Sequence, residues 1–255
     1  MIYGFDSADG YDLTTERARL FTADLIEQRE DGIMFLAEKI LAARDRRLDM
    51  LNVKYLMVST PGPQFDMLSA SDRFLPVFSQ RGVAVFENRR SLPRFFSAPL
   101  SRIEVIRDRS AQLLRLKEAS FDPQQTVIFS ESPRELNAAN SEPVALNVGL
   151  QVVDNRINGY RIRMESTAPA VLVVSQMYYP GWKAMVDGSE VPVYAVNVAL
   201  TGLVIAKGSH DIRLFFQPES FRLGLMISLA SLVVACLLFI GSTPMSARNA
   251  IKVPH

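Results

Sequence analysis

Apolar residues occupy nearly every position of residues 223–240, and none of these positions is charged. The least apolar members of the stretch are Gly224, Ser228, Ser231 and Cys236. As an α-helix, the stretch would extend about 27 Å, close to the hydrocarbon thickness of a bilayer. A buried helix of a soluble domain is the alternative, but such helices are usually shorter and keep a polar stripe. The pattern predicts one transmembrane helix over residues 222–241, followed by a short polar tail over 242–255.

Alternation of apolar and polar residues dominates residues 140–221. In residues 160–166, Tyr160, Ile162 and Met164 alternate with charged residues, the pattern of a strand with one face on a core. Further candidate strands are ALNVGLQVV, AVLVVSQ, WKAMVD, VPVYAV, LVIA and HDIRLFF. Candidate tight turns between them are Asp154-Asn155, Asp187-Gly188 and Lys207-Gly208. Short strands at this spacing predict an antiparallel β-sandwich.

The first third of the chain shows helical spacing instead. Thr14 or Thr15 can cap a helix through ERARLFTADLIEQ, and Gly32 separates it from a second expected helix in IMFLAEKILAARDRRLDML. Strands are expected in NVKYLMVST and GVAVFEN, and residues 93–131 are expected to hold a strand, a helix over 110–119 and a strand over 126–129. The stretch SPRELNAANSEP, rich in Ser, Asn and Pro, is the best candidate linker, and we place the domain boundary near Ala138 to Pro143.

The expected fold class is therefore α+β. A mixed helix/strand domain, with an N-terminal helical and small α/β segment, is predicted over residues 1–139. The antiparallel β-sandwich domain is predicted over 140–221, before the transmembrane helix.

Composition excludes several classes of function. The chain has 28 Lys and Arg against 27 Asp and Glu, a net charge of +1, which is not the electrostatic footprint of a nucleic-acid binder. Its one cysteine, Cys236, lies in the apolar stretch, and its two histidines are His210 and His255, so zinc sites and Ser–His or Cys–His pairs have few candidates. His210 is expected at the surface. We expect no nucleic acid, no metal, no cofactor and no catalytic residue in this chain.

Three groups of charged residues carry weaker signals. Three aspartates near the N-terminus superficially suggest a calcium loop: Asp6, Asp9 and Asp12. Their spacing and the missing distal Glu do not fit an EF-hand, so a polar loop is favoured. Three arginines are expected on a solvated helix face: Arg44, Arg46 and Arg47. A carboxylate pair such as Glu165 and Asp187 leaves a hydrolase interpretation open, because the sequence does not set their separation.

Aromatic residues gather around Pro180-Gly181, where Tyr178, Tyr179 and Trp182 lie within five positions. Exposed rings near a membrane can stack on sugars or lie at the lipid interface, whereas buried rings would fill the core and rigidify a turn. Both interpretations stay open. A cation flanking the span can pair with a lipid phosphate. The candidate ligand-binding residues are Tyr178, Tyr179, Trp182 and Arg222.

The segments YYPGWKAMVDGSEVPV and GLVIAKGSHDIRLFFQPESFRLGLMISL carry a family resemblance. Their Tyr-Tyr-Pro-Gly-Trp hairpin, Asp-Gly turn, Gly-x-His motif and Ser-Phe-x-x-Gly before an apolar helix are similar to the C-terminal end of the YfhO family of bacterial multi-pass membrane proteins. The similarity extends upstream through FDPQQTVIF, LPRFF, VAVFEN and LNVKYLMV to MIYGFDSADGYD.

The resemblance implies an architecture like that of GT-C-type glycosyltransferases, whose acidic extracytoplasmic loops act on a polyprenyl-phosphate sugar. Those loops would correspond to a part of the architecture upstream of Met1, so the chain is expected to be a C-terminal portion without activity alone. It implies an extracytoplasmic accessory region anchored in the bacterial plasma membrane. Its expected partners are the bilayer, the multi-pass part of the same architecture and a lipid-linked sugar or cell-envelope glycan. The alternative is an autonomous membrane-tethered glycan- or protein-binding module.

Overall fold

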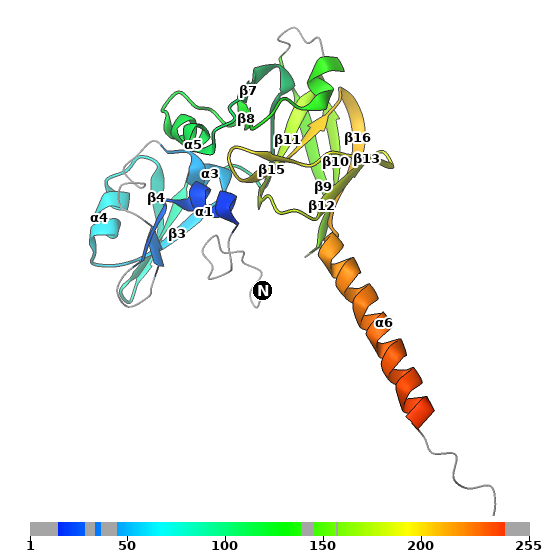
Figure 1. Cartoon of the computed structure of the whole chain (residues 1–255). Coiled ribbons are helices and arrows are strands. Elements are labelled where there is room, and N and C mark those ends of the chain that lie inside the picture. The colour runs from blue at the N-terminus through cyan, green and yellow to red at the C-terminus, as the bar shows by residue number, and fades with distance from the viewer. Residues whose placement is uncertain (1–14, 29–33, 37–44, 139–144, 157, 243–255) are drawn as a thin grey trace, which may run out of the picture. The chain divides into compact units, whose positions relative to one another are not determined.

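The computed structural model describes residues 15–28, 34–36, 45–138, 145–156 and 158–242 (Figure 1). Contacts divide the chain into two units, Met1–Phe215 and Phe216–His255. The first unit contains the sheets, and the second contains one long helix, α6 (Glu219–Ser242). The predicted α+β class is confirmed: several β-sheets, including a curled half-barrel, precede one C-terminal apolar helix.

A six-stranded sheet forms the centre of the first unit. Its strands, in spatial order, are β6 (Phe95–Pro99), β11 (Ala170–Met177), β15 (Leu200–Ile205), β14 (Tyr194–Val196), β8 (Val127–Phe129) and β7 (Ile103–Val105). All neighbours are antiparallel except β7 and β8. Residues 170–174 of β11 are apolar at every position and fully buried, because both faces of this sheet are covered.

The five-stranded sheet covers one face of the six-stranded sheet. Its order is β13 (Ser189–Val191), β12 (Trp182–Val186), β16 (Gly208–Phe216), β10 (Gly159–Ser166) and β9 (Val148–Arg156). Tyr160, Ile162 and Met164 are buried while the charged residues between them are exposed, which confirms the predicted alternation. The shared apolar core contains residues from both sheets, including Leu172, Leu203 and Ile212. This is the predicted antiparallel sandwich.

The opposite face of the six-stranded sheet packs on helices. The covering elements are α1 (Glu16–Thr22) and α5 (Arg109–Lys117), with the 3₁₀ turns η1 (Leu100–Arg102) and η2 (Arg134–Ala138) connecting nearby strands. Phe21 of α1 and Leu116 of α5 are fully buried in the core on this side. The expected helix over 110–119 and strand over 126–129 are thereby confirmed within one or two residues.

A separate three-stranded sheet belongs to the N-terminal region. It consists of β3 (Tyr55–Ser59), β5 (Val83–Asn88) and β4 (Phe74–Gln80), in that spatial order. Along the chain, α3 (Arg47–Met50) precedes β3, and α4 (Pro63–Ser69) lies between β3 and β4. Leu56, Leu68 and Phe86 fill its own small core. The two strands expected from the sequence are confirmed as β3 and β5. The helix α4 was not predicted, although Pro63 occupies its first turn, where proline is favoured.

The first expected N-terminal helix begins as predicted, with Thr15 as its cap, but its extension past Thr22 is wrong, as is a helix over residues 34–36. Helix α1 ends at Thr22, and β1 (Ile26–Gln28) then pairs with β2 (Met34–Leu36) as an antiparallel hairpin. The reason lies in a distant side chain: Arg47 donates from Nη1 to the carbonyl oxygens of Phe21 and Ala23, at 2.7 and 2.8 Å. These bonds satisfy carbonyl groups at the end of α1 and so stabilise its termination. Residues 37–44, in the second expected helix, lie outside the described residues, as does the expected polar loop with Asp6, Asp9 and Asp12.

The six-stranded sheet takes strands from both sides of the expected boundary near 138–143, where residues 139–143 lie outside the described residues. The domain division at residue 139 stays a prediction.

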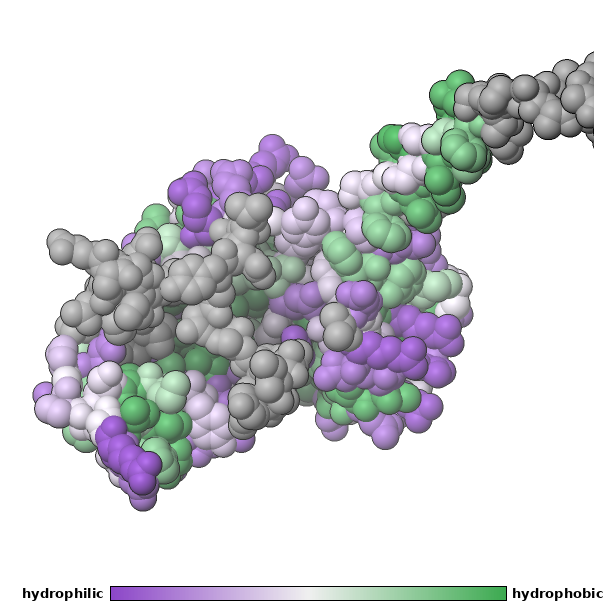
Figure 2. Space-filling model, turned by 90° about the horizontal axis from the view of Figure 1, so that it is seen from below, coloured by the Kyte–Doolittle hydropathy of each residue, from purple (hydrophilic) through white to green (hydrophobic). Residues whose placement is uncertain are grey.

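Helix α6 is apolar on all sides. Within the described residues, one segment, Glu219–Phe239, is long and apolar enough to cross a membrane, and none of it is buried. Figure 2 shows hydrophobic surface along the part of α6 in view. A core helix would bury most of its side chains. Exposed side chains such as Leu229, Val233 and Phe239 therefore favour the predicted membrane span.

Candidate functional site

The loop from Tyr178 to Trp182 joins β11 to β12 and holds three of the four candidate residues. Tyr178 donates its backbone N–H to the carbonyl of Ala199 at 2.6 Å, and Trp182 donates its own to Tyr179 at 3.3 Å. Gly181 has φ of 119°, a conformation that glycine adopts without strain, so the Pro-Gly pair sets this turn. Backbone hydrogen bonds thus hold the loop at both ends, which fixes the Cα positions from which its aromatic side chains extend.

The indole of Trp182 stacks on the ring of Tyr160, with centroids 6.0 Å apart and planes 14° from parallel. Phe95 meets the same tyrosine edge-on at 5.3 Å, and the guanidinium of Arg94 lies 5.5 Å from its ring centre. Pairs of this kind contribute about 0.5–1.5 kcal/mol each beyond their buried area. We call Arg94, Phe95, Tyr160 and Trp182, with Tyr178 and Tyr179, the aromatic site.

The three predicted aromatic residues have different environments. Tyr179 is 50% exposed, whereas Tyr178 and Trp182 are half-buried. Near Tyr178, Arg17 donates to the carbonyl of Val198 at 3.0 Å. Burial lowers the pKa of Arg17, and Arg109 acts in the same direction, while Tyr178 and Glu16 oppose the shift. The structure therefore places one ring outward and uses the other two partly for packing.

Gln176 adds a polar group close to this loop. It lies in an irregularity of the β11–β15 pairing between Val174 and Met177. Among the described residues, its side-chain oxygen Oε1 is buried with no hydrogen-bond donor. An unsatisfied buried acceptor costs about 1–3 kcal/mol, so this oxygen lowers the stability of the structure where it lies.

The aromatic site lies at the end of the sandwich from which the chain leaves for α6. Tyr160 pairs with Leu214 of β16, and β16 ends at Phe216. Gln217 and Pro218 alone separate β16 from α6. Arg222, the fourth candidate, has its backbone in α6, and its side chain lies outside the described part of the structure. The sequence did not assign Arg94, Phe95, Tyr160 or Gln176 to the site, because their association depends on strand pairing. The segments that hold them indicated only strands and a family resemblance.

A second motif, the Asp-Gly turn followed by Gly-x-His, is explained by one contact. His210 Nδ1 lies 2.6 Å from Asp187 Oδ2, and the backbone N–H of Asp211 donates to Asp187 Oδ1 at 2.8 Å. Gly208 has φ of 129° and leaves room for the imidazole, because a Cβ would lie 3.4 Å from His210 Nε2. The expectation of a surface His210 is wrong: its side chain is 16% exposed, because it packs beside Gly208 and binds Asp187.

The contacts of Asp187 bear on the hydrolase interpretation. The hydrogen bond from His210, followed by that from the Asp211 backbone, lowers the pKa of Asp187 below its usual value. A general acid in a carboxylate pair needs a raised pKa instead. Glu165 is exposed and pairs through its backbone with Ser209. These contacts favour a structural role in which Asp187 ties the β12–β13 turn to β16.

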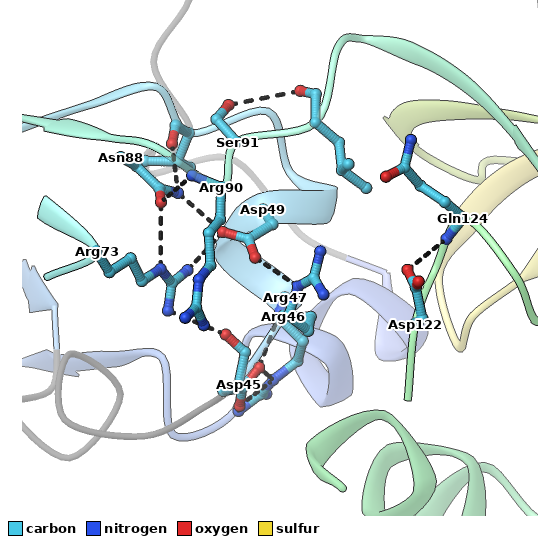
Figure 3. A network of polar contacts seen from close by, with 12 residues as sticks. Asp45, Arg46, Arg47, Asp49, Arg73, Asn88, Arg90, Ser91, Asp122 and Gln124 are labelled. Carbon is cyan, nitrogen blue, oxygen red and sulfur yellow. Dashed lines mark hydrogen bonds and ion pairs between the residues drawn. The ribbon is translucent and has the colours of Figure 1, made fainter. Parts of the chain in front are cut away.

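A buried network of charges occupies the N-terminal region (Figure 3). Arg47 is fully buried and donates to both carboxylate oxygens of Asp45. Asp49, also fully buried, accepts from Arg73 at 2.6 Å, from Arg46 at 2.7 Å and from Asn88 at 2.9 Å. The expectation that these arginines form a solvated face is wrong for Arg47, because its guanidinium is buried by its hydrogen bonds to Asp45 and to the end of α1. Arg46 is half-buried, and Arg44 lies outside the described residues.

The network has structural partners for its main charges. Burial lowers the pKa of Arg73, while Asp49 acts in the opposite direction through its charge and hydrogen bond. Within the described residues, no group of three or more His, Cys, Asp or Glu side chains could hold a metal ion. The network therefore connects α3 to β5 and to Arg73, the residue before β4, and its role is structural.

These features define a class: an α+β protein in which a β-sandwich, with an aromatic site at one end, continues directly into one candidate membrane helix. Residues 114–228, from α5 into α6, match the model of the family described as bacterial membrane protein YfhO. The chain therefore carries a YfhO family domain over these residues. Before residue 114, the resemblance stays a prediction. None of the curated proteins and none of the solved structures compared with the chain gave a match.

Proposed function

We propose that this chain is a membrane-anchored, extracytoplasmic accessory region of a glycosyltransferase-like YfhO assembly in the bacterial plasma membrane, not catalytic alone. The carrying observation is the two-residue connection between the sandwich end that holds the aromatic site and the candidate span. A lipid-linked sugar has its polar part at the surface of the bilayer. The aromatic site would contact that polar part.

The chemistry of the aromatic site supports this ligand class. Tyr179 and the half-buried Trp182 offer ring faces on which a sugar can stack. In the proposal, Arg222 pairs with the lipid phosphate, as a cation next to a span can do. The role is positioning of the substrate, and the reacting groups belong to the multi-pass partner.

An exposed apolar face of the three-stranded sheet supports contact with that partner. Tyr55, Met57, Leu75, Val77 and Phe78 are each 45% to 76% exposed. Met57 and Phe78 both pair with Val85, so they belong to one row across the sheet. Exposed apolar patches of this kind commonly mark protein interfaces. The alternative function, an autonomous glycan- or protein-binding module, would use the same surfaces without a multi-pass partner.

Titration of the full chain in nanodiscs with a polyprenyl-phosphate hexose tests the proposal. Trp182 is the only tryptophan, so its fluorescence reports on the aromatic site directly. We expect a saturable change, weakened about fivefold or more by Tyr179→Ala. Tyr55→Ala is the matched control, since both tyrosines are 50% exposed. No saturable change, or equal weakening by both variants, would exclude the aromatic site as the contact.

A further inference from the structure

A cavity of about 660 Å³ lies at the opposite end of the sandwich from the aromatic site. Strand β6 begins at Phe95, in the aromatic site, and ends at Pro99, in the cavity wall. On the other sheet, Val148 lines the cavity and pairs with Ser166, at the far end of β10 from Tyr160. The length of a strand therefore separates the two places. The volume falls in the range of about 300–1,000 Å³ typical of small-molecule sites.

The cavity opens where both sheets end in an unpaired strand. Strands β6 and β9 are the terminal strands of their sheets in the described structure. Leu100 donates its N–H to the carbonyl oxygen of Pro169, and in an antiparallel pair only every second residue bonds to the partner strand. Ser97 lies an odd number of positions from Leu100, so its N–H and C=O point away from β11, toward the open edge. Backbone donors and acceptors are thus available in the wall.

The side chains of the wall supply both donors and acceptors. The polar lining consists of Ser97, Ser101, Arg102, Asp122, Gln124 and Gln125. Arg102 donates to the amide oxygen of Gln125 at 3.1 Å, and Asp122 accepts from the backbone N–H of Gln124 at 3.1 Å. In the part of the chain that the structure describes, the hydroxyls of Ser97 and Ser101 and the side-chain amide of Gln124 have no hydrogen-bond partner. These groups remain free to bind a ligand.

The apolar part of the wall comes from Pro99, Ala145, Leu146 and Val148. Pro99 is buried, Leu146 and Val148 are half-buried, and Ala145 is exposed. One guanidinium and one carboxylate leave the polar lining without net charge. The wall therefore combines a small apolar surface with neutral and balanced polar groups, which matches a molecule that carries many hydroxyls on an apolar carbon ring.

We propose that this cavity binds a neutral saccharide, and that it is a second site distinct from the aromatic site. A phosphate would find one cation, Arg102, and would be repelled by Asp122. An added peptide strand would need regularly spaced backbone donors, and Pro99, two positions after Ser97 on the same edge, has no N–H. A neutral saccharide needs neither a second cation nor regularly spaced backbone donors, because its hydroxyls both donate and accept hydrogen bonds.

Calorimetric titration of the full chain in nanodiscs with maltotriose, cellotriose and chitotriose tests this site. We expect at least one to bind, and we expect Gln124→Ala and Arg102→Ala each to weaken that binding about fivefold to tenfold, as for the loss of one hydrogen bond. The matched controls are Gln151→Ala and Arg107→Ala, at exposed positions outside the cavity lining. Both controls should bind as the unaltered chain does.

Tyr179→Ala separates this inference from the proposed function. It should leave trisaccharide binding unchanged, while Gln124→Ala should leave the response of Trp182 to the polyprenyl-phosphate hexose unchanged. The cavity proposal fails if no trisaccharide binds, or if Gln151→Ala weakens binding as much as Gln124→Ala. Tighter binding of trigalacturonate, or binding of an extended Thr/Val peptide in place of the sugars, would also overturn it.

Discussion

The sandwich and the N-terminal region bury interiors of opposite chemistry. Between the two sheets of the sandwich, side chains such as Leu172, Leu203 and Ile212 are fully buried and apolar. In the N-terminal region, Arg47 and Asp49 are just as fully buried, and each has several hydrogen-bonding partners. An apolar core tolerates loss of one group in proportion to its size, whereas a buried charge depends on every partner. The two regions should therefore respond differently to single substitutions.

Removal of one carboxylate from the charged network should have the largest effect. Asp49→Ala leaves Arg73 buried without its 2.6 Å partner and removes acceptors for Arg46 and Asn88. We expect the free energy of unfolding to fall by about 3–5 kcal/mol. Hydrogen exchange of the β5 amides in the full chain measures this loss. The matched control is Asp72→Ala, at an exposed position, which should change stability by less than about 0.5 kcal/mol. Equal effects of the two variants would mean that the network does not hold this region.

Truncation in the sandwich core should have a slightly smaller and strictly local effect. Leu203→Ala removes apolar volume from a fully buried position of β15 and should lower stability by about 2–5 kcal/mol. Denaturant unfolding followed by Trp182 fluorescence reports on this core, against which Trp182 packs. Leu114→Ala, at a leucine that is 66% exposed, is the control. A loss below about 1 kcal/mol for Leu203→Ala would contradict a close-packed interface between the sheets.

The smallest effect should come from the contact between the exposed Asp187 and the half-buried His210. Since folding lowers the pKa of Asp187 below its ordinary value of 3.8, its stabilisation is present above that value and is lost as pH falls through the folded-state pKa. The stability difference between the unaltered chain and Asp187→Asn should therefore shrink on acidification in that window. Unfolding at a series of pH values down to about 3 measures it. A difference that stays constant over the acidic window would remove the assigned carboxylate contact.

The contrast between the apolar interior of the sandwich and the charged interior of the N-terminal region also explains which parts of the fold the sequence could predict. Alternation in residues 160–166 depends on one exposed and one buried face, and β10 has both. The aspartates and arginines of residues 45–49 carry no such signal, because a charged side chain is usually solvated and only the distant partners Arg73 and Asn88 show why Asp49 is inside. The end of α1 likewise depends on Arg47, far away in sequence.

The candidate site was predicted only in part for a similar reason. The sequence identified the loop through its own residues, Tyr178, Tyr179 and Trp182. The stack of Trp182 on Tyr160 and the position of Arg94 depend on which strands become neighbours, which the local pattern does not specify.

Membrane extraction tests the central claim that α6 anchors this chain in a bilayer. Membranes from bacteria that produce the full chain are washed with alkaline carbonate, and the chain is followed in the pellet and the supernatant. We expect it in the pellet, and we expect the double variant Leu229→Arg/Val233→Arg to shift to the supernatant, since each arginine at the centre of a span costs about 2.5–3.5 kcal/mol. Recovery of the unaltered chain in the supernatant would contradict the account.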